Sequence, residues 1–146
     1  MPNILDTAAW PIVHYTMPNH VPADEAGHHI AAFDALLARG EPYALIFSGA
    51  ELPQDSKHFM TLYARWGKQH FAEQKRLCRG AIRVEPDVRK RESFWRKAML
   101  YLMSSRAPYP YRIVATLPEA NALAHTWMAG DGDKPVGHWK PLAPAS

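Results

Sequence analysis

The sequence has few of the features that mark the commoner classes of small protein. It contains one cysteine, Cys78, so no internal disulfide can form, as is typical of a reducing compartment. Its apolar runs all fall short of the roughly 18 residues of a membrane-spanning helix. Its start lacks the basic and apolar segments of a secretory signal. We therefore expect a cytoplasmic protein with no membrane span and a buried, structural thiol at Cys78.

Motifs for cofactor binding and catalysis are missing as well. Neither of the glycine-rich loops that bind nucleotide phosphates occurs. The eight histidines show no metal-ligand spacing, and adjacent His28 and His29 would point about 100° apart on a helix. His58 lies near Ser56, but no carboxylate is clearly placed to orient it, and His70 is expected to be a hydrogen-bonded core residue. We expect no cofactor and no metal site. The sequence favours a protein without enzymatic activity, with a small hydrolase or transferase as an alternative.

The chain does have enough apolar surface for one core. It is 146 residues long, 47% hydrophobic and 21% charged, which is typical of a single folded domain. Short apolar runs alternate in strict order with segments of helical periodicity. Strands are predicted near 11–16, 43–47, 80–84 and 111–115. Helices are predicted between Pro22 and Gly40, Ser56 and about Arg76, Asp87 and Pro108, and Thr116 and Gly130. This order predicts an α/β fold with a four-stranded, mainly parallel sheet flanked by four main helices.

The predicted elements also define the domain organisation. Residues 1–8 form a polar N-terminal leader in this prediction, and residues 9–129 form the α/β domain. Residues 130–146 are rich in Gly and Pro and show no periodicity. Such a segment cannot bury enough surface to offset its ordering entropy, so a flexible C-terminal tail is expected.

Charge is distributed unevenly along the sequence. The segment from Lys75 to Arg112 holds eleven of the 17 basic residues but only three of the 14 acidic ones. Four of these cations, Arg89, Lys90, Arg96 and Lys97, share one sector of the helix predicted after Asp87. This basic face could attract an acidic protein, a phosphate-bearing ligand or an anionic surface.

A second candidate site is the turn that follows the strand near 43–47. In a parallel sheet this turn lies at the carboxyl edge, where free backbone N–H groups at a helix start can receive an anion or a partner's side chain. Its candidate binding residues are Gly49, Asp55, Ser56 and Lys57. We expect Ser56 to cap the helix with its hydroxyl and to lie exposed.

The run Leu45-Ile46-Phe47-Ser48-Gly49-Ala50, followed by Asp55-Ser56 at a helix start, resembles STAS domains. This superfamily includes sulfate-transporter tails and anti-sigma-factor antagonists, and the resemblance covers roughly residues 9–129. The segments Gly80–Val84 and Tyr109–Val114, with Trp127, look like a bacterial branch of STAS-like proteins. The resemblance implies a regulatory, protein-binding role, with Ser56 at the position that a partner kinase phosphorylates in the antagonists.

The leading hypothesis is therefore a non-enzymatic interaction module that binds an acidic protein partner, with a homodimer also possible. A small anionic or lipid-like ligand bound between helices is the alternative, because of the aromatic and Met content of Trp95, Met99, Tyr101 and Met103. Nucleic acid is a less favoured partner, since stacking aromatics are not interleaved with the cations.

Overall fold

The computed structural model describes the backbone of residues 3–50, 52–103 and 108–130, and their side chains except those of 95 and 98–103. The tail expected to be flexible lies outside these residues from Asp131 onward. Among the described residues, no helix combines the length and apolar character that crossing a membrane requires.

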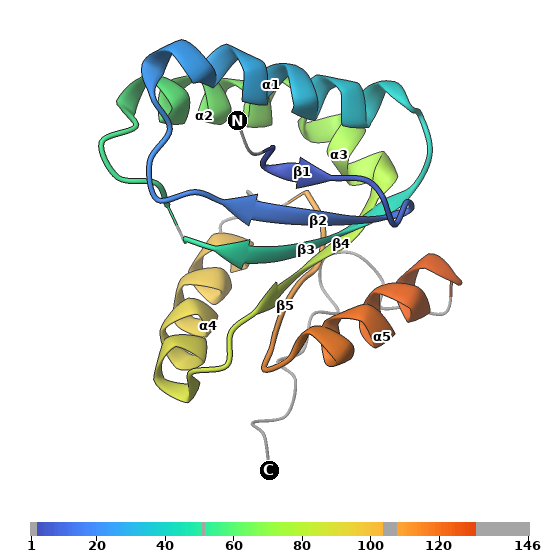
Figure 1. Cartoon of the computed structure of the whole chain (residues 1–146). Helices are drawn as coiled ribbons and strands as arrows, with labels where there is room; N and C mark the ends of the chain where they lie inside the picture. The colour runs from blue at the N-terminus through green and yellow to red at the C-terminus, as the bar shows by residue number, and fades with distance from the viewer. Residues whose placement is uncertain (1–2, 51, 104–107, 131–146) are drawn as a thin grey trace.

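The fold is α/β, with one five-stranded sheet in the spatial order β1-β2-β3-β4-β5 (Figure 1). Strands β2 to β5 are parallel, and β1 pairs antiparallel with β2. The strands are β1 (Leu5–Asp6), β2 (Ile12–Met17), β3 (Tyr43–Gly49), β4 (Cys78–Val84) and β5 (Tyr111–Val114). The helices are α1 (Ala23–Ala38), α2 (Lys57–Gln69), α3 (Phe71–Leu77), α4 (Val88–Met103) and α5 (Leu117–Met128). The prediction of an α/β fold with a mainly parallel sheet is thus confirmed.

The predicted number of strands was wrong, because the segment assigned to a leader contributes β1. Leu5 pairs with Tyr15, and the Thr16 amide donates to the Ile4 carbonyl at 2.9 Å. Ile4 and Leu5 are both buried in the core. A strand of two residues is too short to show the alternation by which strands are recognised in a sequence.

The predicted second helix is also divided in two. His70 leaves helical geometry, with φ −111° and ψ 22°, and separates α2 from α3. The described chain therefore has five helices rather than four. After the break, α3 runs directly into β4 at Cys78, which buries Leu77 and the Cys78 thiol against the sheet.

The helices form two layers around the sheet. Figure 1 shows α1, α2 and α3 over one face and α5 over the other, with α4 beside the carboxyl ends of the strands. Residues that alternate along the strands supply two core clusters: Tyr15 and Leu45 face the first helix layer, while Ile46 and Ile82 face α5. This alternation is what a sheet covered on both faces requires.

The α5 layer lies very close to the sheet at Gly80 in β4. Gly80 has φ +154°, and a Cβ built on it would lie 2.6 Å from Cε3 and 2.9 Å from Cη2 of Trp127. Because real Cβ atoms do not approach other heavy atoms so closely, only glycine fits beneath the indole ring at this position.

Candidate functional site

The turn between β3 and α2 is anchored at its start by backbone geometry. Gly49 has φ +84°, and a Cβ there would collide with the backbone of Met17. The Ala50 amide donates to the Met17 carbonyl at 2.9 Å. At the other end of the turn Asp55 has φ +48°, and both Asp55 and Lys57 are exposed. Gly49 therefore contributes only backbone to the turn. Its carbonyl oxygen accepts a hydrogen bond from the Arg83 side chain of β4.

Ser56 lies at the start of α2, as the sequence predicts, but its surroundings and its hydrogen bonds differ from the prediction. It is 5% exposed, and its hydroxyl makes no hydrogen bond that caps α2. Instead Oγ accepts a hydrogen bond from the Val21 amide at 2.7 Å and donates to the Gln54 carbonyl at 2.8 Å. The predictions of an exposed hydroxyl and of a side-chain cap were wrong, because the hydroxyl joins this turn to the segment between β2 and α1. In this arrangement it is not presented for modification.

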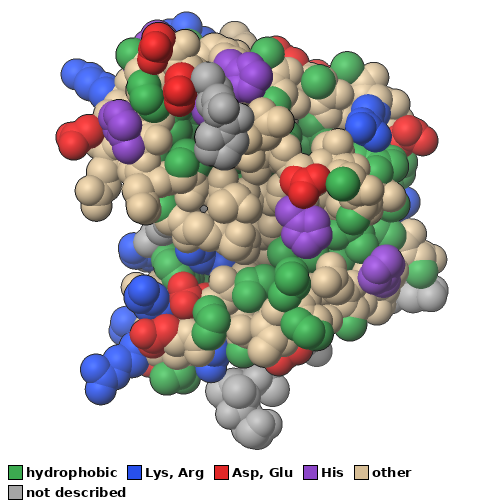
Figure 2. Space-filling model, viewed as in Figure 1, with side chains coloured by type: hydrophobic (Ala, Val, Ile, Leu, Met, Phe, Trp, Pro, Cys, Tyr) green, Lys and Arg blue, Asp and Glu red, His purple; other side chains and the backbone are tan. Residues whose placement is uncertain are grey.

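The four cations predicted to form a basic face are all exposed on α4: Arg89, Lys90, Arg96 and Lys97. Figure 2 shows Lys and Arg side chains gathered at the lower left, where Figure 1 places this helix. Asp87 caps the helix, since its Oδ1 accepts from the amides of Arg89 at 2.9 Å and Lys90 at 3.3 Å. Within the described part of the chain, Arg89, Lys90 and Arg96 pair with no carboxylate.

A fifth cation, Arg83, was not singled out from the sequence. It lies near the carboxyl end of β4, opposite Phe47 of β3 and Ile113 of β5. It is 7% exposed, and its Nη2 donates to the Gly49 carbonyl at 2.6 Å. Its guanidinium carbon lies 4.3 Å from the centre of the Phe94 ring of α4. Arg83 therefore connects the β3–α2 turn with the basic helix, which the prediction treated as separate sites.

Arg91 fixes the start of this helix against the end of β4. Its Nη1 donates to the carbonyls of Glu85 at 2.9 Å and Pro86 at 2.8 Å. Consequently one face of α4 is attached through Arg91 and Phe94, while Arg89, Lys90 and Arg96 project into solvent.

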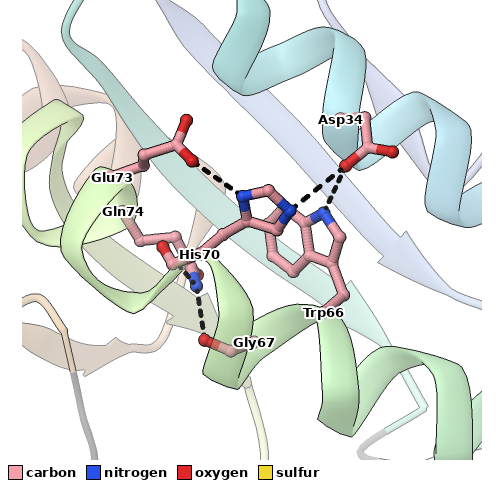
Figure 3. A network of polar contacts seen from close by, with 6 residues as sticks. All are labelled: Asp34, Trp66, Gly67, His70, Glu73 and Gln74. Carbon is pink, nitrogen blue, oxygen red and sulfur yellow. Dashed lines mark hydrogen bonds and ion pairs between the residues drawn. The ribbon is translucent and has the colours of Figure 1, made fainter.

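A separate polar network joins α1, α2 and α3 (Figure 3). Trp66 Nε1 donates to Asp34 Oδ1 at 2.8 Å, and the same oxygen lies 3.6 Å from Nε2 of His70. The Nδ1 of His70 lies 2.8 Å from Glu73 Oε1. Figure 3 shows the imidazole held between the two carboxylates, and Gln74 bonding back to the carbonyls of His70 and Gly67.

This network connects helices and holds no nucleophile. His70 is hydrogen-bonded, as expected, but its side chain is 28% exposed at a helix junction rather than in the core. Among the described residues, no three His, Cys, Asp or Glu side chains converge closely enough to hold a metal ion. We interpret the network as a structural contact that holds α1 against the junction of α2 and α3.

The single cysteine is buried, as predicted. Burial raises the pKa of the Cys78 thiol to about 12, although hydrogen bonds with the Gly80 backbone and the Tyr43 side chain act in the opposite direction. Because the thiolate is the reactive form, Cys78 is a poor nucleophile at neutral pH.

Comparison with protein-family models, curated proteins and solved structures found no match to this chain. The candidate site must therefore be interpreted from its own geometry.

Proposed function

We propose that this chain is a non-enzymatic, STAS-like interaction module and that the exposed basic face of α4 binds an acidic protein partner. The observation that supports this best is the exposure of four cations on one helix, three of which lack any carboxylate partner in the described chain.

The anchoring of α4 makes this surface suitable for binding. Exposed cations are usually neutralised by neighbouring acids or dispersed among them, and each isolated pair contributes little to stability. Here Asp87 and Arg91 hold the start of the helix in place, and Arg89, Lys90 and Arg96 form no ion pair with a carboxylate of the described residues. A concentrated field of one sign raises association rates with an oppositely charged partner and weakens as salt rises.

The test uses two variants that lose the same number of charges. In the α4 variant, Arg89, Lys90, Arg96 and Lys97 become Gln. In the control variant four exposed cations of α2 and α3 become Gln instead: Arg65, Lys68, Lys75 and Arg76. Binding of a deca-glutamate peptide is measured at several salt concentrations.

We expect the α4 variant to bind the peptide at least tenfold more weakly than the wild type and with a flatter salt dependence, while the control stays close to wild type. Equal loss in both variants would mean that only net charge matters, and the proposal would fail. A single-stranded RNA of matched charge serves as competitor. If it binds wild type tenfold more tightly than the peptide at equal salt, the partner class is wrong.

A further inference from the structure

Arg83 is a buried charge that the described chain does not neutralise. Its guanidinium offers five N–H donors, and the structure gives it one acceptor, the Gly49 carbonyl. Its Nε is inaccessible to solvent and has no hydrogen-bond partner. Fully buried arginines are rare unless they are paired, because the cost of removing the charge from water must be offset.

Packing alone does not explain why this position is an arginine. The residues paired with Arg83 on the two neighbouring strands are apolar: Phe47 on β3 and Ile113 on β5. Phe94 closes over the guanidinium with its ring face, an arrangement that suits a cation but supplies no countercharge. A leucine or methionine at this position would fill the space at lower electrostatic cost.

The location is also where a ligand can reach the sheet. Arg83 lies near the carboxyl ends of parallel strands, the edge at which α/β folds bind ligands. Gly49 contributes a carbonyl there but no side chain. Figure 2 shows the molecular outline hollowed at this edge, between the helical layer above and the basic helix below.

We infer that Arg83 is the anchor of a binding site for a small molecule that carries a carboxylate or phosphate group. The planar guanidinium matches both oxyanions through paired N–H donors, and its low-dielectric surroundings strengthen the attraction. Phe94 forms the wall of the site, and the cations of α4 raise the local concentration of anions. The site goes beyond the proposed protein-binding role and does not depend on it.

The first experiment uses full-length wild type with inorganic phosphate and citrate as probes, at constant ionic strength adjusted with chloride. Arginine Nε–H resonances are followed by NMR, and the Arg83 signal is assigned from its absence in Arg83→Met. We expect a saturable shift of this signal. At ten times the dissociation constant, the anion should raise the folding equilibrium constant about elevenfold.

The variants separate a ligand site from a structural cation. Arg83→Met should fold at least as stably as wild type in chloride and lose the response to phosphate and citrate. Arg79→Met, an exposed change in the same strand, should keep the response. If Arg83→Met is stabilised by the anions as much as wild type, the inference is overturned. If Arg83→Met does not fold, the wild-type titration decides, and an unmoved Arg83 signal rejects the site.

The source of the anion is tested in the same series. A response to deca-glutamate without any response to free phosphate or citrate would overturn the small-molecule site and assign Arg83 to the acidic partner. The α4 four-Gln variant should retain a saturable Arg83 shift with citrate. Loss of peptide binding and loss of the Arg83 response are therefore separate results, so either proposal can fail alone.

Discussion

Gly80→Ala should destabilise the protein more than any other glycine-to-alanine change in the described chain outside the β3–α2 turn. Two costs combine at this position. A residue with a Cβ is strained at φ +154°, which costs on the order of 1–3 kcal/mol. The new methyl group also meets Cε3 and Cη2 of Trp127, and overpacking of this kind costs about 1–3 kcal/mol.

The middle of the combined range is about 4 kcal/mol, a large share of the 5–15 kcal/mol by which domains are ordinarily stable. With a urea dependence of about 2 kcal/mol per M, the midpoint of unfolding should fall by about 2 M. Equilibrium urea unfolding, followed by far-UV circular dichroism, measures this shift without relying on tryptophan emission.

A double-mutant cycle tests the steric part of this reasoning. Trp127→Leu removes the six-membered ring that Gly80 contacts, so in that background Gly80→Ala should lose only the backbone cost, leaving a coupling of about 1–3 kcal/mol. Gly67→Ala in α2 is the matched control: nothing lies within 4 Å of its new methyl group, and it should stabilise the protein by about 0.5–1 kcal/mol. Purely additive effects at Gly80 and Trp127 would refute the packing explanation.

Three further predictions follow from the contacts described above. Ser56→Ala should lower the free energy of unfolding by about 1–3 kcal/mol, because it leaves the buried Val21 amide without its acceptor; a urea midpoint equal to wild type would contradict this. Asp34→Ala should cost about 1 kcal/mol through the lost Trp66 hydrogen bond, whereas Asp34→Asn, which keeps a carbonyl acceptor, should cost less in the same assay. The raised pKa of Cys78 means that the folded state keeps the thiol protonated after the unfolded chain has ionised, so its contribution to stability is complete below about pH 9 and declines toward pH 12. Cys78→Val should therefore show a smaller loss of stability than wild type between pH 8 and pH 11.

The parts of the fold that the sequence could predict are those in which a local pattern and the tertiary structure agree. The run Tyr43–Phe47 is apolar because β3 is covered on both faces. Thr116 begins the predicted last helix with a local signal, since its hydroxyl accepts a hydrogen bond from the Glu119 amide at 3.3 Å. The break at His70 has only a weak local signal, Gly67 three residues earlier, and its geometry includes contacts of His70 with Asp34 and Glu73 on either side.

The candidate site could also be predicted only in part, because local patterns indicate some of its residues and contacts between distant residues determine the others. The basic face follows from helical periodicity, so the positions of the four exposed cations on α4 were accessible from the sequence. Arg83 was not, because an arginine between Ile82 and Val84 is also compatible with a strand that has one solvent-facing side. Part of its cover is the ring of Phe94 in α4, a contact that the residues of the strand do not indicate. The burial of Ser56 could not be predicted, because the partner of its hydroxyl, the Val21 amide, is distant in sequence.

The small strand β1 covers part of one edge of the sheet. Without it, the backbone of Ile12–Met17 would form an open sheet edge, and such an edge can pair with the same edge of a second chain. Leu5 and Asp6 occupy part of that edge with antiparallel hydrogen bonds, and the segment continues into the buried Ile4. The N-terminal segment thus leaves less of β2 open to pairing with another chain, and we expect removal of residues 1–8 to expose this edge.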